Sequence, residues 1–172
     1  MTPTLQERIE PRREQVVDWS SALLAGLVAG AVFFLALFFL APLLSGFNGW
    51  VYVRLTASLV RGDSVLAPPA TFDGSLLALA LVVHFGLSIL SSLAIAFVFH
   101  RWGFLVGILG GGLFGCVLYG IGFFAMTAVF PWLVQMRGVD MLIGHILFGA
   151  VAGGVYEALE VEEWVEVDGD EE

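Results

Sequence analysis

Four long apolar stretches alternate with short polar segments along this chain. Each stretch reaches the roughly 20 residues that an α-helix needs to cross a hydrocarbon core about 30 Å thick. Lys, Arg, Asp and Glu occur in these stretches only near their ends. The pattern predicts an all-α integral membrane protein, a four-transmembrane-helix bundle. The predicted spans cover residues 19–44, 74–99, 102–130 and 140–159.

The polar segments divide the chain around this membrane domain. With 172 residues in total, there is no room for a second folded domain. The first span is too long for a signal peptide and lacks a clear small-residue cleavage site, so we expect a retained anchor. Residues 1–18 are predicted to form a cytoplasmic N-terminal segment, residues 19–159 the membrane domain, and residues 160–172 an acidic cytoplasmic tail.

The loop between the first two spans carries a helical pattern of its own. Val51, Leu55 and Leu59 recur every four residues, with Arg54 and Arg61 beside them. This spacing predicts a short amphipathic helix in the membrane interface, with its apolar face towards lipid and its arginines towards the headgroups. A plain connector with chance periodicity is the alternative. Aromatic residues predicted to lie at the same interface are Trp50 and Trp132.

Charge is distributed unevenly along the chain, whose formal net charge is −9. The segment from Glu157 to Glu172 holds nine acidic residues and no basic one, which predicts a solvated, mobile tail. A docking strip for a basic partner is the alternative, whereas nucleic acid is excluded as a partner because it needs a basic surface. The absence of Lys is typical of a GC-rich bacterial genome. Three arginines precede the first span, so we expect both termini on the cytoplasmic side of a bacterial inner membrane.

Aspartates stand at the start of three predicted spans. They are Asp18, Asp73 and Asp140. A short carboxylate at this place accepts hydrogen bonds from free amides of the first turn and complements the positive end of the helix dipole. We therefore predict that all three cap their helices.

Glycines recur at helical spacing in three of the spans. In the third span they come at every fourth residue, a run of overlapping small-xxx-small motifs. Small residues let helix backbones approach closely where lipid supplies no hydrophobic drive between helices. The pattern indicates tight packing within the chain or, alternatively, a contact with a partner protein. The predicted packing residues are Gly26, Gly30, Gly103, Gly107, Gly111, Gly115, Gly149 and Gly153.

Two polar stripes within the spans form the candidate intramembrane site. His84 and Ser88 share one face of the second span, and His145 and Tyr156 share one face of the fourth. At 1.5 Å per residue the two histidines differ in depth by roughly 7 Å. An ionisable residue inside a span is a functional candidate. The two histidines allow three interpretations: neutral side chains that link helices by hydrogen bonds, a b-type haem held by the pair, and a proton or substrate pathway.

The residue sets that typify catalysis are missing from the sequence. No nucleophile stands beside a base, no paired carboxylates occur in an apolar setting, and no glycine-rich phosphate loop follows a strand. Cys116 is the only cysteine, which excludes an internal disulfide and a cysteine metal cluster. We therefore predict no catalytic residue, no metal site and no cofactor other than the possible haem b.

Several short motifs follow one another from the second span onward. They are His84-Phe85 with Ser88, the glycine-rich third span with Tyr119, Phe130-Pro131-Trp132, Arg137-Gly138, and His145 with Phe148-Gly149. In this order the chain resembles the YagU-like family of four-span bacterial inner-membrane proteins. The resemblance covers about half of the chain. It implies the same four-span architecture, without an established reaction or ligand.

Dense packing motifs, short loops and the lack of a catalytic set are typical of small accessory subunits. We predict a non-enzymatic structural subunit of a respiratory or photosynthetic complex in the inner membrane. Its expected contacts are the lipid bilayer and either partner membrane proteins or further copies of itself. The alternative is a small carrier or a b-type haem protein that uses His84 and His145.

Overall fold

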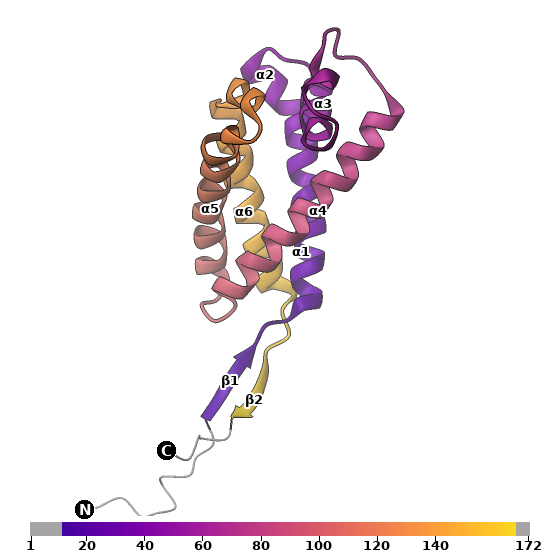
Figure 1. Ribbon diagram of the computed structural model, residues 1–172. Coiled ribbons are helices and arrows are strands. Elements are labelled where there is room, and N and C mark those ends of the chain that lie inside the picture. The colour runs from indigo at the N-terminus through magenta and orange to yellow at the C-terminus, as the bar shows by residue number, and fades with distance from the viewer. Residues whose placement is uncertain (1–11, 168–172) are drawn as a thin grey trace, which may run out of the picture.

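The computed structural model describes residues 12–167. The helices form a bundle, and a two-stranded ribbon extends from one end of it (Figure 1). We call this end, where the first span begins and the last span finishes, the terminal end, and the opposite end the loop end. The four apolar helices run over Trp19–Ser45, Gly74–Phe99, Phe104–Ala128 and Val139–Leu159, within two residues of the predicted limits. The fold class is confirmed, and the chain is a multi-pass membrane protein.

The first and third spans each contain an interruption of regular α-helical hydrogen bonding. The first consists of α1 (Trp19–Leu35), the π-helical turn η2 (Ala36–Leu40) and α2 (Ala41–Ser45). The third consists of α5 (Phe104–Gly120), the π-helical turn η4 (Ile121–Ala125) and the 3-10 turn η5 (Met126–Ala128). The second and fourth spans are α4 (Gly74–Phe99) and α6 (Val139–Leu159), and the 3-10 helix η6 (Pro131–Met136) leads into α6.

A proline explains the interruption in the first span. Pro42 has no amide hydrogen to donate to the Phe38 carbonyl, its partner in a regular α-helix. The next helix begins against this carbonyl, so that a Cβ added to Gly49 would lie 2.5 Å from the Phe38 oxygen. Position 49 therefore needs glycine for the chain to turn back onto the first span.

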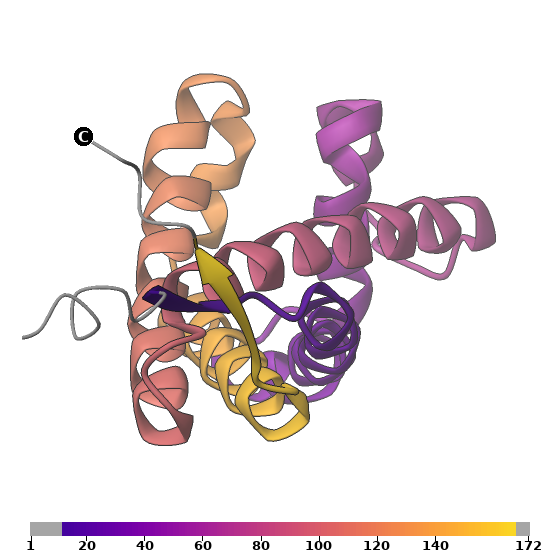
Figure 2. The same cartoon turned by 90° about the horizontal axis from the view of Figure 1, so that it is seen from below.

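The helix α3 (Gly49–Arg61) runs crosswise to α1 at the loop end (Figures 1 and 2). The side chain of Asn48 caps it by accepting hydrogen bonds from two amides of the first turn. The helix itself was predicted, but the predicted contact of its apolar face with lipid is wrong. Its residues Val51, Leu55 and Leu59 pack against the main core cluster of the bundle instead.

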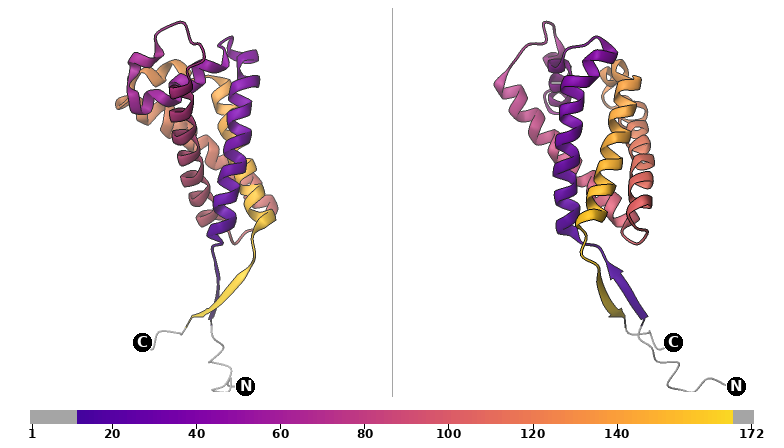
Figure 3. Two further views of the ribbon diagram at one scale, coloured as in Figure 1. Left: turned by 90° about the vertical axis from the view of Figure 1, so that its right-hand side faces the viewer. Right: turned by 180° about the vertical axis from the view of Figure 1, so that it is seen from behind.

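The spans pack around α1 and α6. Helix α5 lies along α6, α6 lies along α1, and α1 crosses α4. Towards the loop end α4 diverges from α1, and α3 fills the wedge between them (Figures 1 and 3). The 3-10 helix η3 (Asp63–Leu66) then leads from α3 towards α4. Buried residues of the main core cluster include Phe33, Leu37, Phe123 and Phe148.

The ribbon pairs β1 (Arg12–Val16) with β2 (Glu163–Val167) in antiparallel register (Figure 3). Gln15 lies opposite Trp164, and Val16 lies opposite Glu163. Residues 163–167 of the predicted acidic tail are therefore paired as a strand, and residues 163–165 are exposed, as expected for a solvated segment. Because the ends of α1 and α6 are already joined, little loop-closure entropy opposes the pairing. The remainder of the two predicted terminal segments, residues 1–11 and 168–172, lies outside the described residues.

Candidate functional site

The candidate intramembrane site begins where α1 crosses α4. Gly26 permits the close contact, since a Cβ added to it would lie 2.8 Å from the Cα atom of Ile89. At this separation polar side chains of α4 reach backbone carbonyls of α1. The hydroxyl of Ser92, which is fully buried, donates a hydrogen bond of 2.8 Å to the Ala22 carbonyl. The crossing is therefore held by backbone contact and by a side-chain hydrogen bond.

His84 forms the second hydrogen bond of this crossing. Its Nε2 atom lies 2.8 Å from the Gly30 carbonyl oxygen. Since a carbonyl only accepts, Nε2 carries the hydrogen and donates it. Ser88 lies on the same face, as its spacing indicates, and its hydroxyl donates to the His84 carbonyl at 2.8 Å. The stripe predicted on α4 thus faces α1 and bonds to backbone atoms.

His145 occupies a separate aromatic pocket on α6. Its Nδ1 atom donates to the Met141 carbonyl of its own helix at 2.8 Å. Three aromatic rings surround the imidazole. Their centroids lie 4.9 Å (Phe33), 5.7 Å (Phe123) and 6.0 Å (Tyr119) from that of His145. The imidazole therefore contributes to packing on several sides and makes its hydrogen bond within α6.

The side chain of Phe33 packs against both histidines. Its ring centroid is 5.5 Å from that of His84 and 4.9 Å from that of His145. A porphyrin held by both imidazoles would need the space that Phe33 fills, and His84 Nε2 already donates to a backbone carbonyl. The arrangement of these residues does not fit a haem coordinated by the pair.

Tyr156 was predicted to share the site of His145, and this prediction is wrong. Three helical turns separate the two residues, and Tyr156 lies at the terminal end, where its side chain is 1% exposed. Its hydroxyl accepts from the Asp18 amide at 3.3 Å and donates to Glu160 Oε1 at 3.2 Å. The same Glu160 oxygen accepts from Gln15 at 2.9 Å. Tyr156 therefore joins the start of α1 to the end of α6.

Asp18 forms the other half of this connection. Its carboxylate accepts from the amides of Ser20 and Ser21 and from the amide of Val161. Hydrogen bonds from the two serine side chains are the main reason that the pKa of Asp18 lies well below its ordinary value of 3.8. Burial has the opposite effect on Glu160, whose pKa is raised.

The glycines of α5 and α6 form the closest helix contact in the bundle. A Cβ added to Gly111 would collide with the carbonyl oxygen of Gly149, and one added to Gly115 with that of His145. Likewise, a Cβ added to Gly153 would collide with the Gly107 carbonyl oxygen. The spacing thus serves packing within the chain.

Gly103 departs from this pattern, and its predicted packing role is wrong. It precedes α5 with φ +78°, and a Cβ added to it would have no atom within 4 Å. The residue supplies a left-handed turn between α4 and α5, which glycine adopts without steric cost.

A carboxylate that the sequence analysis did not single out lies at the α5–α6 contact. The Cγ atom of Glu157 lies over Gly107, where an added Cβ would be 2.6 Å away. Glu157 Oε1 is buried and has no hydrogen-bond partner among residues 12–167. Its burial could not be predicted from its position near the end of α6, because the space for the side chain is provided by Gly107 on a different helix.

A second polar cluster lies at the loop end. The Tyr52 hydroxyl donates to Asp140 Oδ2 at 2.7 Å and lies 2.8 Å from Ser45 Oγ. Burial and the neighbouring Asp140 carboxylate raise the pKa of Tyr52 to about 12, so the phenol stays protonated and donates. The prediction that Asp140 caps α6 is wrong, because Gly138 holds the cap position. Asp18 and Asp73 do cap α1 and α4, as predicted.

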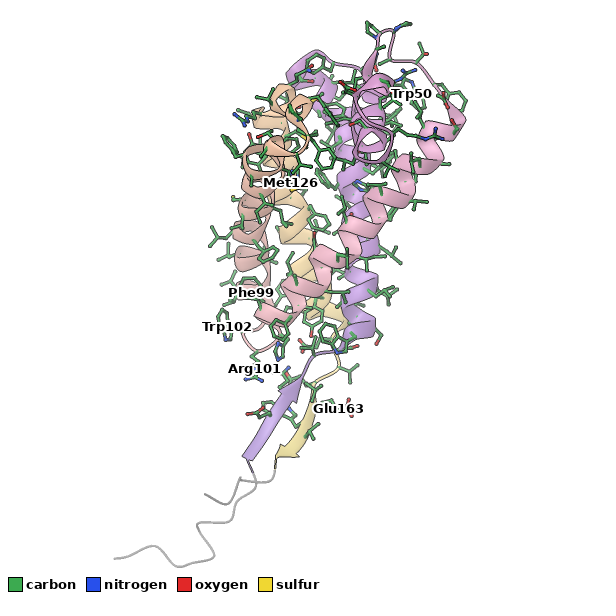
Figure 4. All side chains as sticks on the ribbon, viewed as in Figure 1. Trp50, Phe99, Arg101, Trp102, Met126 and Glu163 are labelled. Atoms are coloured by element: carbon green, nitrogen blue, oxygen red, sulfur yellow. The ribbon has the colours of Figure 1, made fainter. Side chains whose placement is uncertain are left out.

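The predicted interfacial residues make contacts within the protein. Arg54 was expected to point towards headgroups, but its guanidinium donates to the Val65 carbonyl at 3.0 Å and so ties the following loop to α3. Trp50 packs against Phe38, with ring centroids 5.0 Å apart. Arg61 is the exception, since it is exposed at the end of α3. Trp50 lies at the loop end, and Arg101 and Trp102 lie at the terminal end of the bundle (Figure 4).

Residues 12–167 contain no group of three or more His, Cys, Asp or Glu that could hold a metal ion. Compared with known proteins, the chain matches no family model, no curated protein and no solved structure. The resemblance to YagU-like proteins therefore stays a prediction. What the geometry offers is a bundle whose polar side chains bond to its own backbone, a terminal connection with a projecting ribbon, and a polar cluster at the loop end.

Proposed function

We propose that this protein is a non-enzymatic accessory subunit of a larger complex in a bacterial inner membrane, with both termini in the cytoplasm. The observation that carries the proposal is the ribbon formed by β1 and β2, which projects from the bundle (Figures 1 and 3). Within the described residues each strand has one neighbouring strand only, so each has an outer edge to which no further strand is paired. Such edges bind extended segments of partner proteins.

The use of the intramembrane polar side chains supports a structural role. His84 and Ser92 donate to carbonyls of α1, and His145 donates to a carbonyl of α6. Each of these donors therefore links or stabilises helices. The interpretation of the histidines as neutral helix-linking residues thus accounts for their hydrogen bonds without a ligand.

The outer surface of the bundle leaves room for partner helices. Only 22% of the most apolar part of the third span is buried inside the chain, against 44% for the fourth span. Large apolar side chains of α5, among them Leu109 and Leu113, are 64% and 67% exposed. This face contacts lipid or the helices of a partner. Respiratory and photosynthetic complexes are the expected hosts, because they contain small helical subunits of this kind.

The experiment is affinity purification of the tagged protein from native membranes in mild detergent, with mass spectrometry of the proteins that co-elute. Val165→Pro removes an amide donor from β2 and should break strand pairing. Val165→Thr keeps a β-branched residue at the same position and serves as the matched control. We expect the wild type and Val165→Thr to bring down the same stoichiometric partners and Val165→Pro to lose them.

Two results would count against this proposal. Elution of the wild type alone, or only as a homo-oligomer, would contradict the accessory role. Retention of every partner by Val165→Pro would contradict the ribbon as the contact. The haem alternative is tested separately by the absorbance spectrum of the purified protein after haem-replete expression, where we expect no Soret band because Phe33 packs against both imidazoles.

A further inference from the structure

Asp140 differs from the two other aspartates that precede or begin spans. Asp18 and Asp73 each use one carboxylate oxygen to accept two amides of the following helix. Asp140 lies beyond the cap position in the first turn of α6. Its Oδ2 atom accepts the Tyr52 hydroxyl at 2.7 Å, and Oδ1 accepts no hydrogen bond from the part of the chain that the structure describes. One oxygen of this carboxylate is therefore available.

The nearest arginine in sequence does not neutralise Asp140. Arg137 Nε donates to the Phe123 carbonyl at 2.6 Å, and its NH2 group donates to Thr127 Oγ1 at 3.0 Å. The guanidinium carbon also lies 4.5 Å from the centroid of the Phe124 ring. Arg137 thus binds the π-helical turn η4. No other arginine among residues 12–167 forms an ion pair with Asp140, and the sequence contains no Lys.

Asp140 is one of the residues that line an open groove at the loop end, where its Oδ1 atom lies next to Gly138. The groove has a volume of about 330 Å³ and combines apolar walls with a few polar groups. Among the apolar residues Leu44 and Val139 are 67% and 69% exposed, so the walls continue onto the outer surface of the bundle. Its lining residues are Leu44, Ser45, Phe47, Gln135, Met136, Gly138, Val139 and Asp140.

The chemistry of the groove favours one class of ligand. Placing an anionic oxygen beside apolar walls costs free energy, because the oxygen loses hydrating water, unless a positively charged donor compensates for that loss. A divalent cation such as Ca²⁺ takes about 6 to 8 oxygen ligands, and this cluster offers the oxygens of Asp140, Tyr52 and Ser45. A primary ammonium group needs only a few acceptors. An apolar chain attached to it would lie against Leu44 and Val139.

We propose that this groove binds an ammonium group carried on an apolar chain, with Asp140 Oδ1 as the charged acceptor. Tyr52 positions the carboxylate by donating to Oδ2, and Ser45 contacts the Tyr52 hydroxyl in turn. Two sources supply this chemistry: the headgroup of phosphatidylethanolamine in the bilayer and a soluble alkylamine. The inference is independent of the ribbon and of the accessory role.

The test compares lipid adducts by native mass spectrometry. The protein is released from liposomes that contain equal amounts of phosphatidylethanolamine and phosphatidylcholine with matched acyl chains. A second arm titrates hexylamine into protein held in phosphatidylcholine nanodiscs and follows the midpoint of thermal unfolding. Enrichment of phosphatidylethanolamine without a response to hexylamine identifies the lipid headgroup, and a response to hexylamine identifies a free amine; either result supports an ammonium site.

Two variants and one control variant test whether the Asp140 carboxylate is responsible for the binding. Asp140→Asn removes the charge and should weaken ammonium binding about tenfold or more, the size expected for loss of a charge-assisted hydrogen bond. Asp63→Asn removes the same charge from an exposed loop residue at the same end of the bundle, and should leave binding unchanged. Gln135→Lys introduces a competing ammonium into the groove without altering Asp140, and should also abolish ligand binding.

The proposal is overturned if neither ammonium ligand is preferred by the wild type. It is also overturned if Asp140→Asn and Gln135→Lys bind as the wild type does. Should Asp140→Asn fail to fold, Gln135→Lys decides the question alone, since its side chain lies on an exposed lining position.

Discussion

The ring of Phe33 packs edge-on against the imidazole of His145, with their centroids 4.9 Å apart and their planes at 71°. The same ring also packs against His84, at a centroid distance of 5.5 Å. A single apolar side chain of α1 therefore contacts the two ionisable groups of the candidate site, one on α4 and one on α6.

Replacing Phe33 should destabilise the bundle by creating a cavity at its centre. Phe33→Ala is expected to cost about 3–5 kcal/mol of unfolding free energy, the usual loss for a buried phenylalanine. Phe39→Ala provides the control, because Phe39 is 62% exposed and its loss leaves no internal void. Thermal unfolding in detergent, followed by circular dichroism, measures the difference. Equal loss of stability in both variants would contradict a central role for Phe33.

The α5–α6 contact should be intolerant of a single added methyl group. Gly111→Ala would place a Cβ against the Gly149 carbonyl and force the helices apart, so we expect a loss of several kcal/mol, as for other overpacked sites. Gly86→Ala has open space around it and should leave stability unchanged or slightly higher. Chemical unfolding curves of the two variants give the comparison. A stable Gly111→Ala protein would show that the helices do not pack this closely.

The hydrogen bond from His84 to the Gly30 carbonyl should contribute modestly to stability. His84→Leu removes the donor and is expected to cost about 1 kcal/mol, in line with other hydrogen bonds between membrane helices. His84→Gln retains an N–H donor near the same place and should recover part of that loss. Unfolding free energies of the three proteins in one detergent test this. If Gln and Leu behaved alike, the hydrogen bond would not be the relevant contact.

The terminal connection should make stability fall in acid. Hydrogen bonds to the carboxylate lower the pKa of Asp18 in the folded protein. Its contribution is therefore complete above the ordinary value of 3.8 and is lost as the pH falls through the lower folded-state pKa. Asp18→Asn keeps an oxygen that can cap the helix but removes the titrating group, so it should flatten the decline below about pH 4. Asp18→Ala removes the cap as well and should cost about 1 kcal/mol at neutral pH.

Glu160, in the same terminal connection, contributes a pH dependence of stability that is opposite to that of Asp18. Burial raises its pKa above the ordinary 4.5, so its contribution is present in acid and declines as the pH rises through the folded-state pKa. Glu160→Gln should remove this decline while keeping a side chain that accepts from Gln15. Melting temperatures from pH 3 to pH 8 separate the two effects. A pH profile unchanged by either substitution would exclude these groups as its cause.

The spans were predictable from the sequence because a membrane-spanning helix is recognised by its length and apolar composition alone. A run of apolar residues long enough to cross a bilayer is visible without knowledge of its neighbours, and even the capping by Asp18 and Asp73 follows from local sequence. The glycine spacing indicated faces of close helix contact on α5 and α6, but not whether the contact lay within the chain or with a partner protein.

Contacts between distant segments were not predictable in this way. The contact of Phe33 with both histidines depends on how α1 is rotated against two other helices, and no periodicity reports that rotation. Tyr52 and Asp140 are 88 residues apart in sequence. The ribbon joins two five-residue strands from opposite ends of the chain, too short to stand out beside four apolar spans.

The ribbon also determines how a mechanical force applied near the chain ends is transmitted to the bundle. Because β1 leads directly into α1 and β2 follows directly from α6, the first and last spans are coupled outside the bundle as well as within it. A partner that grips either strand exerts force on both spans at once, in the same direction along their axes. Because α5 packs closely on α6 and α4 is hydrogen-bonded to α1, such a force would be passed on to all four spans.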